Sequence, residues 1–147
     1  MTDMNGAIWP AEPGTYALVV DVIDPLELTV GMLGFVRLSP GRYTYVGSAY
    51  GPGGLHGRLA RHARRDRRRH WHIDYLTEIA PMSYVYFRTH AKPLECRWAQ
   101  RLLDLSGATA PAPGFGSSDC RQGCLAHLVR LPDGFQFTQL AELLSNE

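Results

Sequence analysis

The chain is poor in cysteine, has no long apolar run and carries almost no net charge. Its 147 residues include three cysteines, Cys96, Cys120 and Cys124. That number is too small, and odd, for the disulfide framework of a small secreted domain. No apolar stretch approaches the ~20 residues needed to cross a bilayer, and the first residues lack the basic and apolar regions of a signal peptide. We therefore expect a cytoplasmic protein with no membrane partner.

The overall composition is that of an ordinary folded domain. Apolar residues make up 45%, aromatic residues 10% and charged residues 20% of the chain, which excludes disordered and collagen-like classes. A length of 147 residues suits one domain with a single core. We expect residues 1–13 to form an N-terminal leader and residues 14–147 to form the domain.

The net charge of +1 hides an uneven distribution. Seven of the 15 basic residues lie between Arg58 and Arg69, where Asp66 is the one acid, and the rest of the chain is acidic. A basic strip on an acidic body is the electrostatic pattern of a phosphate-binding surface. A solvated helix face is the alternative, but like charges at helical spacing repel one another. We favour the phosphate-binding interpretation, with nucleic acid as the partner.

Residue patterns predict a small sheet with helices packed against it. Residues 14–23 are apolar on both alternating faces, as in a central strand. Further strands are predicted at residues 28–30, 35–38, 42–46 and 83–89; helices at 55–69, 70–79, 93–106 and 140–145; a hairpin from 125–131 and 135–138; and a long loop at 108–123. This order indicates an α/β or α+β fold.

The first predicted helix places polar groups on its apolar stripe. Arg58 and His62 fall on the inward face with the leucines of this helix. An inward arginine implies either a buried salt bridge or a cleft that receives an anion, and we favour the cleft. The opposite face is expected to project into solvent and follow a phosphate backbone through four arginines, Arg61, Arg64, Arg65 and Arg68.

Other polar residues are open to two interpretations. Glu95 extends the apolar stripe of the third predicted helix, where it can hold Mg²⁺ or Mn²⁺, but a first-turn carboxylate also stabilises a helix N-terminus. Tyr16, Tyr43 and Tyr45 lie on predicted strands. Each can be a core residue, or a phenol whose pKa is lowered by nearby positive charge and which acts as a general base.

Two further clusters involve histidine or cysteine. His70, His72 and Asp74 stand at a helix start, where capping and salt bridges are more common than metal binding, so we expect them to border the cleft.

The second cluster, Cys120, Cys124 and His127, has the spacing C-x3-C-x2-H, and Asp119 could complete a Zn²⁺ site. That spacing is not typical of a zinc knuckle, so we favour buried thiols and a turn capped by Asp119. Ser118 and Asp119 remain candidates to line the substrate cleft.

Several ordered blocks of sequence resemble one known family. Gly14-Thr15-Tyr16, Tyr45-Val46-Gly47-Ser48, the block RLARH and the later Glu95 resemble the signature of the GIY-YIG nuclease superfamily. The blocks YVGSAYGPGGL, HWHIDYL, LECRWA and GFGSSDCRQGCLAHL resemble more closely its small stand-alone, Uri-type branch, some members of which are fused to endonuclease III-type proteins. The resemblance covers about residues 14–131.

The resemblance implies a three-stranded antiparallel sheet flanked by helices and phosphodiester hydrolysis with one Mg²⁺ or Mn²⁺ ion. By this resemblance Glu95 would bind the metal and Arg58 would stabilise the transition state. Tyr16 or Tyr45 would position or deprotonate water, and His62 would share the proton transfer.

The chain departs from the superfamily pattern in two places. Thr15 replaces the usual isoleucine on the side of the strand away from Tyr16, where we expect it to be harmless. The 28 residues between Tyr16 and Tyr45 replace a tight turn, so an extra hairpin at 28–38 is expected.

These patterns predict a metal-dependent endonuclease acting on DNA. A nucleic-acid-binding module that keeps the fold without cleavage is the alternative, because the basic strip alone would bind phosphates. A structural zinc domain is a third possibility.

Overall fold

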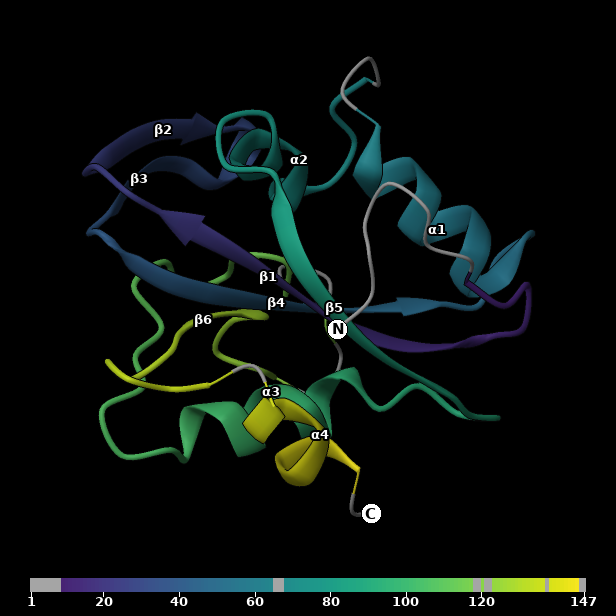
Figure 1. Cartoon of the computed structure of the whole chain (residues 1–147). Coiled ribbons are helices and arrows are strands. Elements are labelled where there is room, and N and C mark those ends of the chain that lie inside the picture. Colours follow the sequence, from purple (N-terminus) through teal and green to yellow (C-terminus); the bar gives the residue numbers. More distant parts are fainter. Residues whose placement is uncertain (1–8, 65–67, 118–119, 121–122, 137, 146–147) are drawn as a thin grey trace.

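A computed structural model of the chain describes residues 9–64, 68–117, 120, 123–136 and 138–145 (Figure 1). Its elements in chain order are β1 (Gly14–Val22), β2 (Leu26–Val30), the 3-10 turn η1 (Gly31–Leu33), β3 (Gly34–Leu38), β4 (Gly41–Ala49), α1 (Gly54–Ala63), α2 (His72–Thr77), β5 (Met82–Thr89), α3 (Glu95–Leu103), β6 (Leu128–Arg130) and α4 (Thr138–Leu144). The predicted α+β class is confirmed.

The main sheet is antiparallel and has the strand order β5-β1-β4-β6. The central strand β1 pairs with β4 from Gly14 opposite Ala49 to Val22 opposite Gly41, and with β5 on its other side. Nearly every residue of β1 is buried, which explains why its sequence is apolar on both faces. The sheet has four strands instead of the expected three, because the short β6 pairs with β4.

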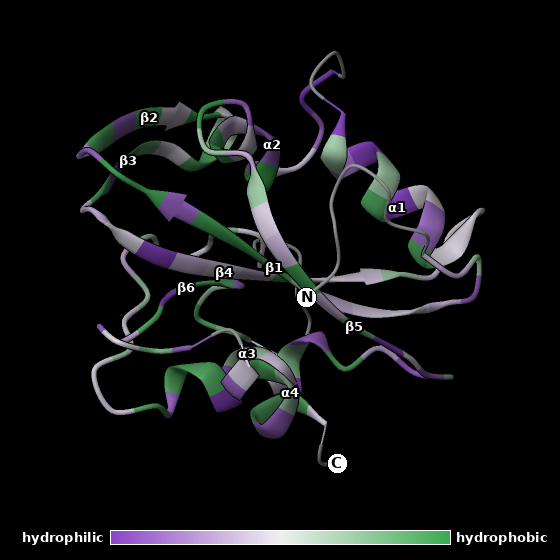
Figure 2. Ribbon diagram, in the orientation of Figure 1, coloured by the Kyte–Doolittle hydropathy of each residue, from purple (hydrophilic) through white to green (hydrophobic). Residues whose placement is uncertain are grey.

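Each face of the sheet supports its own core. Successive residues of β1 point to opposite faces, so Tyr16 and Leu18 join one cluster while Ala17 and Val19 join the other. The first cluster includes residues of α1, α2 and the β2–β3 hairpin, and the second includes residues of α3 and α4, on the opposite side of the sheet (Figure 1). Figure 2 shows hydrophobic and hydrophilic residues mixed along α3 and α4, as expected of helices with one face on a core.

The hairpin expected between the two tyrosine motifs is present. Strands β2 and β3 form a separate two-stranded sheet, and their buried residues belong to the core beneath α1 and α2. At the turn, Gly31 lies against the hydroxyl of Tyr75 in α2. The insertion is therefore part of the fold.

Two predicted elements differ from the structure. Helix α1 ends at Ala63 and not near residue 69, because Arg64 takes an extended conformation (φ −80°, ψ 146°). In a longer helix, arginines three and four positions apart would repel one another. Arg61, in the last turn of α1, instead pairs with Asp74. The second strand of the predicted C-terminal hairpin is also wrong. Residues 135–136 lie outside any strand, and Thr138 begins a helix whose Leu140 and Leu144 are buried in the second core.

Part of the expected leader packs onto the domain. Trp9 is buried in the first core. The carbonyls of Pro10 and Glu12 accept hydrogen bonds from the backbone N–H groups of His56 and Leu55. These contacts satisfy donors at the start of α1 that have no partner within the helix. Among the described residues, no helix has the length and apolar character that crossing a bilayer requires.

Candidate active site

A pocket of about 440 Å³ opens beside the two paired strands β1 and β4. It is lined by residues of β1, β4, α1 and α3 and of the segments that precede α2, α3 and β6: Tyr16, Tyr45, Gly47, Ser48, Arg58, Trp71, Pro93, Glu95, Cys96, Gly116, Cys120 and His127. Four of the five residues predicted to be catalytic, Tyr16, Tyr45, Arg58 and Glu95, therefore share one cavity.

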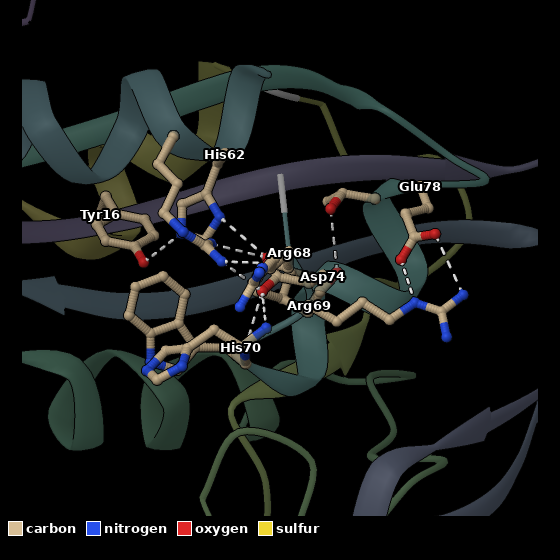
Figure 3. A network of polar contacts seen from close by, with 11 residues as sticks. Tyr16, His62, Arg68, Arg69, His70, Asp74 and Glu78 are labelled. Atoms are coloured by element: carbon tan, nitrogen blue, oxygen red, sulfur yellow. Dashed lines mark hydrogen bonds and ion pairs between the residues drawn. The ribbon is translucent and has the colours of Figure 1, made fainter. Parts of the chain in front are cut away.

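The fifth residue, His62, lies directly behind Tyr16. The Tyr16 hydroxyl is 2.8 Å from Nε2 of His62, and both side chains are buried (Figure 3). Asp74 Oδ1 lies 4.0 Å from Nδ1 of the same ring. This carboxylate favours the tautomer with its proton on Nδ1, so that Nε2 accepts the hydrogen bond from the phenol. The His62 ring therefore lies between the pocket residue Tyr16 and the buried carboxylate of Asp74.

Tyr16 fits only because its neighbour across the sheet is glycine. Gly47 pairs with Tyr16 in the β1–β4 register, and a Cβ at this position would stand 2.5 Å from the tyrosine hydroxyl. Burial raises the pKa of Tyr16, while the guanidinium of Arg58 opposes the shift. Burial likewise raises the pKa of Tyr45. Both phenols therefore remain protonated and act first as hydrogen-bond donors.

Arg58 is held at the pocket wall by uncharged partners. Its guanidinium donates to the carbonyl of Ser48 at 2.9 Å and lies over the ring of Trp71, with Cζ 4.2 Å from the centroid. Among the described residues no carboxylate forms an ion pair with Arg58. This agrees with a cleft that receives an anion and not with a buried salt bridge.

Arg61 has a structural role that the sequence analysis did not foresee. Both oxygens of Asp74 accept hydrogen bonds from Arg61 at 3.0 Å, and the Arg61 side chain is 21% exposed. The prediction that Arg61 projects into solvent is therefore wrong, because the buried carboxylate holds its guanidinium. Asp74 also accepts from the backbone N–H groups of His70 and Trp71, in the helix-capping role expected of it (Figure 3).

The hydrogen bonds to Asp74 decide its ionisation. Burial alone opposes the charged form, but the hydrogen bonds from Arg61 and from two backbone N–H groups outweigh it and lower the pKa of this carboxyl well below its usual range. Asp74 is therefore a fixed negative charge behind His62.

The remaining residues expected to bind nucleic acid are placed differently from one another. Arg64, Arg68 and His70 are exposed beyond the end of α1. His72 is instead turned toward the loop before β6, where Nδ1 accepts from the N–H of Gly116 at 2.8 Å. Arg65 lies outside the described residues, as do two candidates of the glycine-rich loop, Ser118 and Asp119.

Glu95 begins α3 and reaches the pocket from the other helical layer. Its side chain is 31% exposed, and Oε2 lies 3.9 Å from Nδ1 of His127. One carboxylate at an open pocket fits Mg²⁺ or Mn²⁺, which keep several waters and bind through one or two carboxylates together with substrate phosphates. The chemistry of the site therefore accommodates the ion that the resemblance implied.

Thr15 fixes the start of that helix. It lies on the face of β1 away from Tyr16, as predicted, and is fully buried. Its hydroxyl accepts a hydrogen bond from the N–H of Leu94 at 2.9 Å, one residue before Glu95. The expectation that threonine here is a harmless replacement was incomplete, since the hydroxyl anchors the backbone that carries the candidate metal ligand.

Sequence reasoning missed several contributors to this pocket. Trp71 was within a recognised block, but nothing in the pattern showed that its ring would face both Arg58 and Arg61. Ser48 has a buried hydroxyl that makes no hydrogen bond within the described residues, and it lines the cavity. Cys96 joins Cys120, Cys124 and His127 in one cluster, although the next cysteine is 24 positions further along the chain.

The fold and pocket define a class before any relative is considered: a small α+β domain with a tyrosine, histidine, arginine and glutamate gathered at one cavity. Among protein families, the one described as Domain of unknown function DUF123 matches residues 15–146. The chain belongs to this family. No curated protein and no solved structure matches it.

Proposed function

We propose that the protein is a divalent-metal-dependent endonuclease of the GIY-YIG type that hydrolyses phosphodiester bonds in DNA. The observation that carries the proposal is convergence: Tyr16, Arg58 and Glu95, from three separate segments of the chain, line one pocket. Phosphodiester hydrolysis needs an activated water, a cation near the developing charge and a metal ligand. The pocket offers one group for each requirement.

Arg58 is the group that would bind the scissile phosphate. Its guanidinium presents several donors in a fixed plane, and the Ser48 carbonyl and Trp71 ring limit its orientation before substrate arrives. Charge that develops on the non-bridging oxygens would then meet a pre-positioned donor. Glu95 would hold the divalent ion, which would supply Lewis-acid stabilisation of the charge that develops on the phosphate.

Tyr16 and His62 would transfer the proton of the attacking water. Because the pKa of the buried Tyr16 is raised, the phenol is a poor base by itself. It can receive a proton from water only while passing its own to Nε2 of His62, 2.8 Å away. The imidazolium that results would be stabilised by Asp74, at 4.0 Å from Nδ1. Tyr45, also protonated, would orient the water.

The DNA would approach across the end of α1. Arg64 and Arg68 are exposed there, in the basic segment, and the wall of the pocket formed by Arg58 and Trp71 lies beside it. Contacts to phosphates through these arginines would position a duplex without reading its sequence.

A cleavage assay with matched carboxylate variants tests the proposal. End-labelled single-stranded, duplex, flap and four-way-junction DNA, with RNA of the same sequences, would be incubated in Mg²⁺ and in Mn²⁺. Wild type should cleave at least one DNA only when metal is present. Glu95→Gln and Arg58→Ala should lower the rate by about 100-fold or more while DNA binding persists. Glu27→Gln, an exposed residue of β2 outside the pocket, is the control and should cleave like wild type.

Three results would contradict the proposal. Salt-sensitive DNA binding without cleavage of any substrate would instead favour the non-catalytic binding module. Full activity in Glu95→Gln would remove the assignment of the metal ligand. Cleavage of RNA alone would overturn DNA as the substrate.

A further inference from the structure

Three cysteines and one histidine meet at one corner of the fold. Cys96 lies in the first turn of α3, Cys120 and Cys124 lie in the segment that precedes β6, and His127 stands immediately before β6. The four ligand atoms, three Sγ and one imidazole nitrogen, all lie within 4.8 Å of one another. These are all the cysteines of the chain, and none forms a disulfide.

The spacing of these atoms is close to that of a tetrahedral metal site. Zn–S bonds of about 2.3 Å and Zn–N bonds of about 2.1 Å place tetrahedral ligand atoms roughly 3.5 to 3.8 Å apart. Cys96 Sγ lies 3.9 Å from Nε2 of His127 and 3.1 Å from Cys120 Sγ. Since all four ligand atoms lie within 4.8 Å of one another, they reach tetrahedral spacing by shifts of about 1 Å or less.

We propose that Cys96, Cys120, Cys124 and His127 bind one Zn²⁺ ion in a closed structural site. Three thiolates and an imidazole are soft and borderline donors, which favour zinc over Mg²⁺ or Mn²⁺. Four protein ligands leave no position for a water, so this ion is structural and distinct from the divalent ion assigned to Glu95. The inference does not depend on nuclease activity.

Zinc would join the start of α3 to the segment that precedes β6. Between α3 and β6 the described residues contain no helix or strand apart from an isolated bridge at Thr109, yet they form one wall of the pocket. Cys96 immediately follows Glu95, so a bond from the ion to Cys96 would tie the start of α3 to that wall. The other ring nitrogen of His127, Nδ1, faces the Glu95 carboxylate at 3.9 Å. A carboxylate behind a zinc-bound histidine orients the ring.

Metal analysis of the full chain tests the site without any activity assay. Protein purified without chelator should contain about one zinc per chain by inductively coupled plasma and native mass spectrometry. Cobalt replacement should give the charge-transfer absorption of thiolate ligands. Cys96→Ser and His127→Gln should each lower the zinc content to less than about a tenth of wild type. His56→Gln, an exposed histidine of α1, is the matched control and should retain the ion.

The Cys96→Ser variant decides between two ligand sets. The sequence spacing of Cys120, Cys124 and His127 alone would suggest a zinc site that does not include Cys96. Should the variants fail to fold, alkylation of wild type decides: all three cysteines should resist reagent in the zinc-loaded protein and react after chelation. The proposal would be overturned by zinc well below one per chain with no thiolate band for cobalt, by full zinc retention in Cys96→Ser, or by a Cys96–Cys120 disulfide in the purified protein.

Discussion

At the scale of single residues, Thr15 links the sheet to the start of α3. Its buried hydroxyl accepts from Leu94 N–H at 2.9 Å, directly ahead of Glu95. Threonine and valine have nearly the same shape, so Thr15→Val removes the acceptor and leaves a buried donor unsatisfied. We expect a loss of about 1–3 kcal/mol in the free energy of unfolding, measured by urea denaturation.

Thr15→Val should also weaken the binding of Mg²⁺ at Glu95, beyond what the loss of stability would cause. If Thr15 positions Glu95, Thr15→Val should raise the Mg²⁺ concentration needed for half-maximal cleavage, whereas Thr15→Ser, which keeps the hydroxyl, should restore it. An unchanged Mg²⁺ requirement in Thr15→Val would limit Thr15 to a role in stability.

Asp74 gives the protein a defined acid sensitivity. Its pKa in the folded protein is lowered from the ordinary value of 3.8 by hydrogen bonds from Arg61 and the backbone. A lowered carboxyl pKa stabilises the fold fully above the unfolded value, and this stabilisation is lost as the pH falls from about 4 toward the lower folded value. We therefore expect the free energy of unfolding to decrease below about pH 4.

Asp74→Asn should be less stable than wild type at pH 7, and this difference should shrink at acidic pH, in denaturant titrations carried out across that range. A difference between the two proteins that stays constant from pH 7 to pH 3 would show that the charge of Asp74 contributes nothing.

At the scale of elements, the β2–β3 hairpin is an insertion that has become part of the core. Leu38 is fully buried in the core that also contains Ile73 and Leu76 of α2, whereas Met32, in the turn between β2 and β3, is fully exposed. Leu38→Ala should therefore cost about 2–5 kcal/mol of stability. Met32→Ala, the control in the same insertion, should change it by less than about 0.5 kcal/mol. Equal effects in thermal or chemical denaturation would show that the hairpin does not contribute to the core.

The sequence predicted the elements better than it predicted their ends. The apolar central strand, the hairpin and the starting regions of α1 and α3 follow from periodicity and turn residues, and they are present. The helical extension to residue 69 was wrong because a propensity argument cannot see that Arg61 has Asp74 as a partner. The final helix was predicted at residues 140–145 and is present as α4, but the strand predicted at residues 135–138 is absent, because so short an apolar pattern does not distinguish a strand from the start of a helix.

Some residues of the candidate site could be predicted from the sequence and others could not. Tyr16, Arg58 and Glu95 could be chosen by their motifs and by polar residues on apolar stripes, and the structure brings them together. Trp71 and Cys96 could not, because their roles arise from contacts between segments distant in the chain. Sequence spacing reveals metal ligands only when they lie close together along the chain. Cys96 is distant in sequence from Cys120, Cys124 and His127, so spacing could not identify it as their partner.

At the scale of the whole molecule, β1 is shared by two cores and by the pocket. Tyr16 faces the pocket and Thr15 faces α3, so the two residues that shape the site lie next to each other and on opposite sides of one strand. Neither layer of helices can therefore be considered independently of the other.

This sharing restricts how the chain can change in length during evolution. Losing or gaining one residue inside β1 would exchange its two faces, sending Tyr16 toward α3 and Thr15 toward the pocket. A substitution there alters one side chain, whereas an insertion or deletion would remove the site and both cores together. Related proteins should accordingly differ in length at the turns near residues 24–25, 39–40 and 132–134, and hardly ever between Gly14 and Val22.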